Sequence, residues 1–223
     1  MGSSTRALAD AIAGEAVRQG RTTPAVRGAD WQTATVTAVG TGTVDCGDIR
    51  ARRLDSYLNP TVGDTAVISR SGQGNWVAHG RTATAADTAW PSYPAAWTSS
   101  GTAPALGNGV LVGRYHKVGR TVHMTINLSI GTTTTGGTGN SFLSLPVQAA
   151  NAGCTYIGHA HWAGNSRWAG QFVIAPAGTT GTPFFPSGAA DVRLTQMNPA
   201  INAPEAVGSG DVLRITATYE SAT

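Results

Sequence analysis

Charge, lysine, cysteine and long apolar runs are all scarce in this sequence of 223 residues. Charged residues make up 12% of it, roughly half of the usual share, while 41% of the residues are hydrophobic. Intrinsic disorder requires the opposite balance and is therefore excluded. No run approaches the ~18 apolar residues of a membrane span. No signal peptide is expected either, because Arg6, Asp10 and Glu15 interrupt the first apolar stretch. We therefore expect a soluble protein that is made in a cytoplasm and does not insert into a membrane.

Positive charge is too dispersed to predict a nucleic-acid partner. The net charge is +3, and Lys117 is the only lysine beside 14 arginines. One short cluster, Arg50-Ala-Arg52-Arg53, is flanked by Asp48 and Asp55. Nucleic-acid binders concentrate positive charge on one face, so we expect no nucleic-acid binding.

The two cysteines and the few acids argue against redox or hydrolytic chemistry. Cys46 and Cys154 lie 108 positions apart. We expect two unpaired, buried thiols, and a disulfide between them is the alternative that the sequence does not exclude. No nucleophile elbow, P-loop or His-Glu-x-x-His motif is present. We expect neither an enzyme nor a cofactor, although a glycosidase pairing of Glu205 with Asp191 or Asp211 stays open.

The residues that are abundant predict a mainly β protein with one short helix. The sequence contains 29 glycines and 11 prolines, typical of short strands joined by tight turns. The exception is a helix over residues 4–19, whose apolar stripe is Leu8, Ile12 and Ala16. That stripe either folds onto the next domain or self-associates around a symmetry axis.

Patterning divides the chain into an N-terminal helix and connector (residues 1–28), a small OB-like barrel (29–83), a linker (84–96) and an antiparallel β-sandwich of jelly-roll type (97–223). The barrel carries few exposed aromatics for base stacking, so a structural barrel is favoured over an oligonucleotide-binding one. In the sandwich, strands are expected at residues 109–116, 121–130, 140–145, 154–162, 171–175, 191–194 and 211–220.

One stretch resembles a known family. It comprises Trp97-Thr-Ser-Ser-Gly-Thr-Ala-Pro-Ala-Leu-Gly-Asn-Gly, then Gly113-Arg-Tyr-His-Lys-Val-Gly-Arg-Thr-Val, an uncharged Gly/Thr loop (131–140) and Phe142-Leu-Ser-Leu-Pro146. This stretch resembles the C-terminal β-domain of minor tail and fibre proteins of phages that infect actinobacteria. The run from Val62-Gly-Asp64 to Gly74-Asn-Trp-Val is similar to OB-like domains of phage tail spikes and baseplate hubs.

The resemblance implies a receptor-binding virion protein of the phage tail. Its expected partners are two further copies of itself in a homotrimer, other tail or baseplate proteins, and a host cell-surface glycan. Two alternatives stay open: an adaptor that contacts only virion proteins, and a glycan-binding module with hydrolytic activity.

Two groups of residues are candidates for a site. Aromatic faces stack on sugar rings, and amide and guanidinium groups bind sugar hydroxyls, so the first group predicts a glycan site on a loop. We expect Trp168 to be exposed there, whereas Trp162 is at least as well suited to a place in the core. His159 and His161 lie two residues apart on one strand face, which makes them metal ligands only if a trimer supplies further imidazoles. The glycan candidates are Tyr156, Trp162, Asn165, Arg167 and Trp168.

Overall fold

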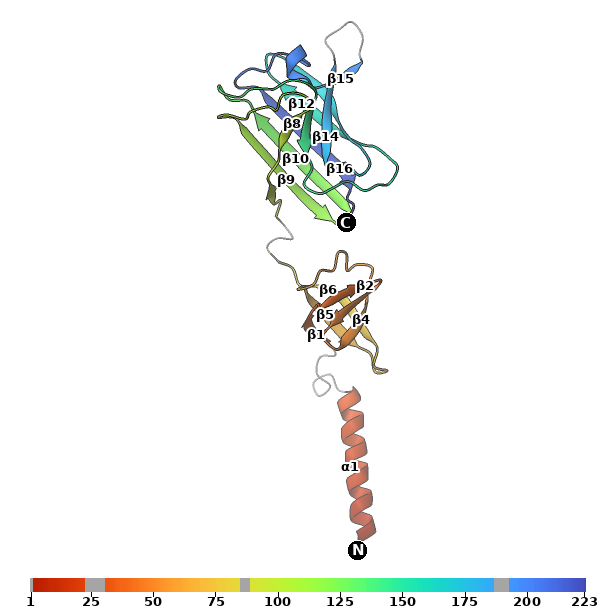
Figure 1. Ribbon diagram of the computed structural model, residues 1–223. Coiled ribbons are helices and arrows are strands. Elements are labelled where there is room, and N and C mark those ends of the chain that lie inside the picture. The colour runs from red at the N-terminus through yellow and green to blue at the C-terminus, as the bar shows by residue number, and fades with distance from the viewer. Residues whose placement is uncertain (1, 23–30, 85–88, 187–192) are drawn as a thin grey trace. The chain divides into compact units, whose positions relative to one another are not determined.

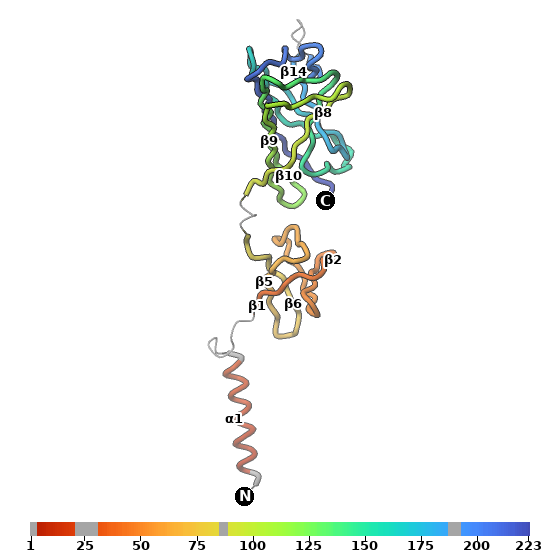
Figure 2. Tube along the Cα trace, turned by 60° about the vertical axis from the view of Figure 1, so that its left-hand side comes forward, coloured from red at the N-terminus to blue at the C-terminus, as the bar shows by residue number. Residues whose placement is uncertain are grey.

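The computed structural model describes residues 2–22, 31–84, 89–186 and 193–223. The chain divides into two compact units, residues 1–84 and 85–223. Strands make up most of its regular structure, with one long helix at the N-terminus (Figure 1). The path of the chain through each unit can be followed in Figure 2. The prediction of a mainly β protein with an N-terminal helix is confirmed.

The helix, α1 (Gly2–Thr22), extends beyond both predicted ends. Side chains 4–19 are all exposed, and Leu8 and Ile12 are each 61% exposed. Arg18 Nε donates to Glu15 Oε2 at 2.8 Å, one turn earlier. No helix in the described part of the chain is long and apolar enough to cross a membrane.

The N-terminal unit contains a closed barrel. Its sheet order is β1-β5-β6-β4-β3-β2, in which β4 and β6 run parallel. The two edge strands, β1 and β2, are successive halves of one bent segment. Because the same segment supplies both edges, the sheet closes on itself as a five-stranded OB-like barrel, as predicted. The strands are β1 (Trp31–Thr35), β2 (Ala38–Gly40), β3 (Thr43–Cys46), β4 (Ile49–Arg53), β5 (Thr65–Arg70) and β6 (Trp76–Arg81).

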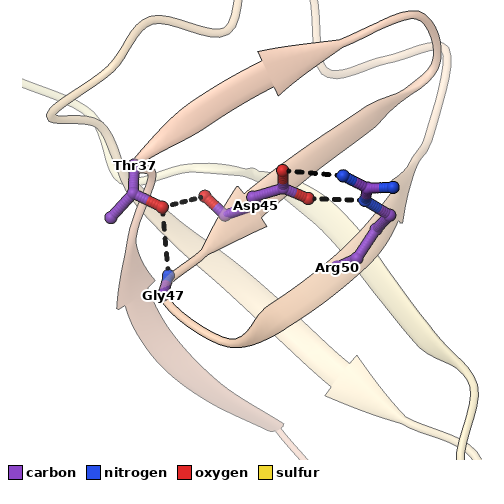
Figure 3. Close-up of polar contacts among 4 residues, drawn as sticks. All are labelled: Thr37, Asp45, Gly47 and Arg50. Atoms are coloured by element: carbon purple, nitrogen blue, oxygen red, sulfur yellow. Dashed lines mark hydrogen bonds and ion pairs between the residues drawn. The ribbon is translucent and has the colours of Figure 1, made fainter.

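Thr37 fixes the bend between β1 and β2 (Figure 3). Its backbone N–H and its hydroxyl both donate to Asp45 O, at 2.7 and 3.1 Å, and its hydroxyl accepts from Gly47 N–H at 3.1 Å. Arg50 donates from Nε and Nη2 to the two oxygens of the Asp45 carboxylate, at 2.8 and 3.1 Å. The turn from β3 to β4 is thus tied to the corner of the barrel.

A largely buried carboxylate holds the segment before β5, whose backbone is hydrogen-bonded to Val36 beside the same bend. Asp64 accepts hydrogen bonds from the Tyr57 hydroxyl (2.8 Å) and from the N–H and hydroxyl of Thr61 (both 2.9 Å). Burial by itself would raise the pKa of Asp64, but these bonds and the charge of Arg81 outweigh it, so the pKa is lowered. The small core around this point consists of Val36, Val44, Cys46, Ala51, Ala66, Ile68 and Ala78.

The C-terminal unit is an antiparallel β-sandwich made from one curled sheet of order β7-β9-β10-β16-β12-β13-β14-β11-β8, with β15 on β14. Its strands are β7 (Ser92–Tyr93), β8 (Trp97–Ser99), β9 (Val110–Val118), β10 (Thr121–Ser129), β11 (Ser141–Ser144), β12 (Tyr156–Ala163), β13 (Arg167–Ile174), β14 (Thr180–Pro186), β15 (Leu194–Gln196) and β16 (Val212–Glu220). The predicted sandwich is confirmed.

One segment again supplies both edges of this sheet. β7 pairs with β9, and β8, a few residues later, pairs with β11. Ser144 ties the crossing between them: Tyr93 Oη donates to its carbonyl (2.9 Å), Ala96 N–H to its hydroxyl (2.8 Å), and its own N–H to Ala96 O (2.9 Å). Residues 92–96, which the sequence assigned to the linker, are therefore part of the sandwich.

The interior is one cluster to which both halves of the sheet contribute. On β10 the buried residues alternate with exposed ones, and β16 repeats the pattern beside it. β14 was not predicted, because Gly181, Pro183 and Pro186 hide its strand pattern. The largest fully buried side chains are Met124, Leu128, Leu143, Trp162, Phe172, Ile174, Phe185, Met197, Leu213, Ile215 and Tyr219.

The Gly/Thr loop (131–140) is bound along its length to residues 100–109. Backbone bonds join Ala105 and Thr135 in both directions, at 2.8 and 3.0 Å. The Asn108 side chain donates to Thr132 Oγ1 at 3.0 Å and accepts from the N–H and hydroxyl of Thr133, at 2.9 and 3.0 Å. A Cβ on Gly137 would collide with Thr102 O and Pro104 N. The glycines allow two backbones to touch, and the threonines satisfy the polar groups there.

We predict that Asp64→Asn destabilises the barrel and flattens its response to acid. The oxygen that accepts from the buried Tyr57 hydroxyl is replaced by a donor or by a single shared acceptor, at a cost of about 1–3 kcal/mol. Because the folded-state pKa of Asp64 is lowered, its contribution is complete above the unfolded pKa and is lost as the pH falls through the folded value. Urea unfolding at pH 7 and pH 3 measures this effect. Asp45→Asn, at an exposed ion pair, is the control and should change stability much less.

We predict that Gly137→Ala destabilises the sandwich more than Gly119→Ala. Both glycines have positive φ, 67° and 60°, so each alanine pays about 1–2 kcal/mol for the left-handed backbone. Only Gly137 has backbone atoms where the methyl group would lie, whereas the space at Gly119 is open. The difference in melting temperature between the two variants measures the cost of the steric clash at Gly137. Equal losses of stability would contradict the close packing of this loop.

Candidate functional site

The aromatic residues expected on a loop lie instead in the β12–β13 hairpin and point inward. Trp162 and Trp168 are directly opposite each other in the ladder. Trp162 is fully buried, and Trp168 is partly buried against the core with its Nε1 shielded from solvent. Tyr156 is also partly buried there. Trp162 is therefore not accessible to a sugar, and Trp168 and Tyr156 are less exposed than a loop position would make them.

Asn165 and Arg167 are exposed at the turn of the same hairpin, where two acids lie beneath them. A Cβ at Gly164 would touch the carboxylates of both Glu205 and Asp211, so these two are neighbours. The Glu205 carboxylate accepts from Trp162 Nε1 at 3.0 Å. The Asp211 carboxylate accepts from Gly208 N–H at 2.7 Å. Each acid thus anchors its own loop, while Asp191 lies outside the described residues.

His159 and His161 share the outward face of β12, since Gly158, Ala160 and Trp162 between and beside them are buried. Two further histidines join them from other strands. His116 on β9 is directly opposite His123 on β10, and both point outward. Four of the five histidines therefore lie on one outer surface. We call this surface the histidine face. It is the outward side of β9, β10, β16, β12 and β13, and the polar and groove-lining residues on it that matter below are Arg114, His116, His123, Thr125, Asn127, Ile157, His159, His161, Gln171, Arg214, Thr216 and Thr218.

The histidine face is hollowed by a groove of about 320 Å³. This volume is at the lower end of the range of ligand pockets. The floor is formed by β10, β16 and β12, where Gly158 and Ala217 present little side chain. Its walls are Trp90, His123, Thr125, Ile157, His159, Thr216 and Thr218.

Trp90 forms one end of this groove and is held in place from two sides. Its ring stacks on that of His116, with the centroids 6.0 Å apart and the planes 29° apart. Its carbonyl accepts from Arg114 Nε at 3.0 Å. The ring is nevertheless 40% exposed. An indole fixed in this way presents an apolar face beside hydroxyl and imidazole groups.

Hydroxyl groups occupy the centre of the groove. Thr218 Oγ1 is 2.9 Å from His123 Nδ1, which sets the orientation of that ring. In the ladders, Thr216 is opposite Thr125 on one side and His159 on the other. The arrangement offers donors and acceptors at regular spacing, as a polyhydroxylated ligand requires.

The part of the chain that the structure describes contains no complete metal-binding site. No group of three or more histidine, cysteine or acidic side chains gathers there. His159 and His161 supply two imidazoles, and the side chains opposite them in the ladders are Thr216, Gln171, Arg214 and Ala169. Neither cysteine is paired: Cys46 is buried and Cys154 is exposed, contrary to the expectation that both are buried. Burial raises the pKa of the Cys46 thiol.

A second hollow, of about 510 Å³, lies on the barrel and is lined by Trp31, Val67, Ser69 and His79. It is largely apolar apart from Ser69 Oγ, which is 2.7 Å from His79 Nε2. The other two aromatics of the barrel are not available for stacking bases, because Tyr57 is buried and Trp76 is covered by the Arg70 guanidinium, 5.7 Å from its ring centroid.

No known protein family matches this chain, and no curated protein or solved structure matches it either.

We predict that Glu205→Ala destabilises the sandwich by about 1–3 kcal/mol, because the buried Trp162 Nε1 loses its acceptor. Glu205→Gln keeps a side-chain oxygen at the same position and should recover most of the stability. Urea unfolding followed by tryptophan fluorescence measures both. If the two variants lost equal stability, the charge rather than the acceptor would be what matters.

Proposed function

We propose that the protein is a virion structural subunit of a phage tail whose C-terminal sandwich attaches the particle to a saccharide on the host surface. The tail assignment is supported by the resemblance of residues 97–146 to minor tail and fibre proteins. The attachment role is supported by one observation above all: the groove on the histidine face, with Trp90 at one end and threonine hydroxyls at its centre.

Binding rather than cleavage is what the groove supports. Glycoside hydrolysis ordinarily uses two carboxylates that flank the bond. None of the residues that line the groove is acidic. The neighbouring acids Glu205 and Asp211 lie at the hairpin turn, where each accepts a hydrogen bond from its own surroundings. A hydrolytic module is therefore the weaker proposal.

The adaptor alternative is favoured by a different observation. The side chains of α1 from residue 4 to 19 are all exposed, including Leu8, Ile12 and Val17. An amphipathic helix of this kind gains most of its stability from packing on a partner. We propose that α1 holds the subunit in the particle, as a homotrimer or against another tail protein, and that the sandwich remains available to the host.

We predict that Trp90→Ala weakens binding to host cell walls about tenfold or more, in line with the loss of a central aromatic at an interface. The measurement is co-sedimentation of the purified full-length chain with host walls. Its solution mass is determined in parallel and is expected to be three times 22.7 kDa.

Trp31→Ala is the matched control, because Trp31 is the exposed tryptophan of the barrel. It should leave wall binding intact. Loss of binding in this control instead would place the site on the barrel. If the wild-type chain does not co-sediment with host cell walls, the proposed attachment role is wrong and the adaptor role is the remaining proposal.

A further inference from the structure

The charges of the histidine face indicate which class of saccharide fits it. Resting on the attachment role proposed above, we infer that the groove and its margin take an acidic saccharide, one that carries carboxylate or phosphate groups. Neutral sugars need only hydroxyl partners and an aromatic ring. This face adds to those two arginines and four imidazoles, with a single acid on the same strands.

Arg114 and Arg214 both point outward on this face, together with the four histidines. Among the outward residues of β9, β10, β16, β12 and β13, the single acid is Glu220, at the last position of β16. Its carboxylate is 3.1 Å from Arg120 Nη1, so its charge is already compensated. An anion on the face therefore meets attraction without an opposing carboxylate near the groove.

The ladders place a guanidinium and imidazoles where one anionic group can reach more than one of them. Arg214 is directly opposite His161 on β12 and Asn127 on β10. Side chains in directly opposite positions have Cβ atoms about 4.5–5.5 Å apart. His159, two residues from His161 on β12, is opposite Thr216 and therefore diagonal to Arg214, at about 7–8 Å. Arg214 and His161 can donate to the same carboxylate or phosphate, for which the planar fork of arginine is well suited, and His159 lies on the groove side of them.

The apolar end of the groove supplies the remaining specificity. Trp90 lies across the strands from His159, with His123, Thr216 and Thr218 between them. A sugar ring against the indole would have its hydroxyls beside the threonines and its acidic substituent toward His159 and Arg214. Both features are needed for an acidic sugar, whereas a simple inorganic anion would use the cationic end alone.

The proposal has one electrostatic consequence. Binding should weaken as salt is raised, because exposed charges are screened over about 8 Å at physiological ionic strength. None of the side chains opposite the four histidines in the ladders is a carboxylate, so no negative charge there opposes an anion.

The test uses the full-length chain and three polymers of similar length: a polyuronate, a poly(glycerol phosphate) and neutral dextran. Titration calorimetry at low salt should show binding to one or both acidic polymers and none to dextran. The double variant His159→Gln with Arg214→Gln should lose about tenfold or more of that affinity, as expected when hydrogen bonds to charged groups are removed. Arg52→Gln, an exposed arginine of the barrel, is the charge-matched control and should change little.

The outcomes separate this inference from the proposed function. Wall binding without binding to either acidic polymer, or with equal binding to dextran, overturns the acidic ligand and leaves attachment standing. If the chain binds an acidic polymer and the double variant binds it equally well, the histidine face is not the binding site. If the double variant does weaken that binding, but the wild-type chain does not bind walls, the ligand class is supported and host attachment is wrong. If neither walls nor polymers bind, both proposals fall.

Discussion

Closure of each sheet by a segment shared between its two edges is the constraint on which both units depend. An open sheet exposes a row of unpaired N–H and C=O groups at each edge and invites association. In the barrel, residues 31–40 pair with β5 and then, past the bend at Thr37, with β3. In the sandwich, residues 92–99 pair with β9 and then with β11. Strands that bend from one neighbour to another are a known way to make such corners.

Closure also decides where a ligand can bind. Among the residues that the structure describes, side chains pack into both interiors: mostly small ones with Tyr57 and Ile68 in the barrel, and Trp162, Phe172, Phe185 and others in the sandwich. The outward surfaces and the loops remain. In the sandwich, the same segment that closes the sheet also carries Trp90 close to the outer surface of β9, where it stacks on His116. Closing the fold and forming one end of the groove are thus two effects of one short segment.

The sequence allowed the fold to be predicted further than the site. Period-two alternation on residues 121–130 and 211–220 was enough to place β10 and β16. Trp168 was misplaced because its direction depends on the turn at residues 164–166, which sets Trp162 and Trp168 opposite each other and turns both inward. The histidine face was missed for a related reason. His116 and His123 lie on the consecutive strands β9 and β10, but His159 comes from β12, much later in the sequence, and only the pairing of β10 and β12 with β16 brings it onto the same face.

The segment that carries the family resemblance turns out to have a structural task. Its glycines and threonines join loop 131–140 to residues 100–109, and Asn108 alone makes three side-chain hydrogen bonds across that contact. Polar groups that are satisfied internally have little left to offer a receptor. Residues of this segment therefore give no information about a ligand. The ligand must be sought where side chains point outward and differ in charge from the rest of the surface, and that description fits the histidine face.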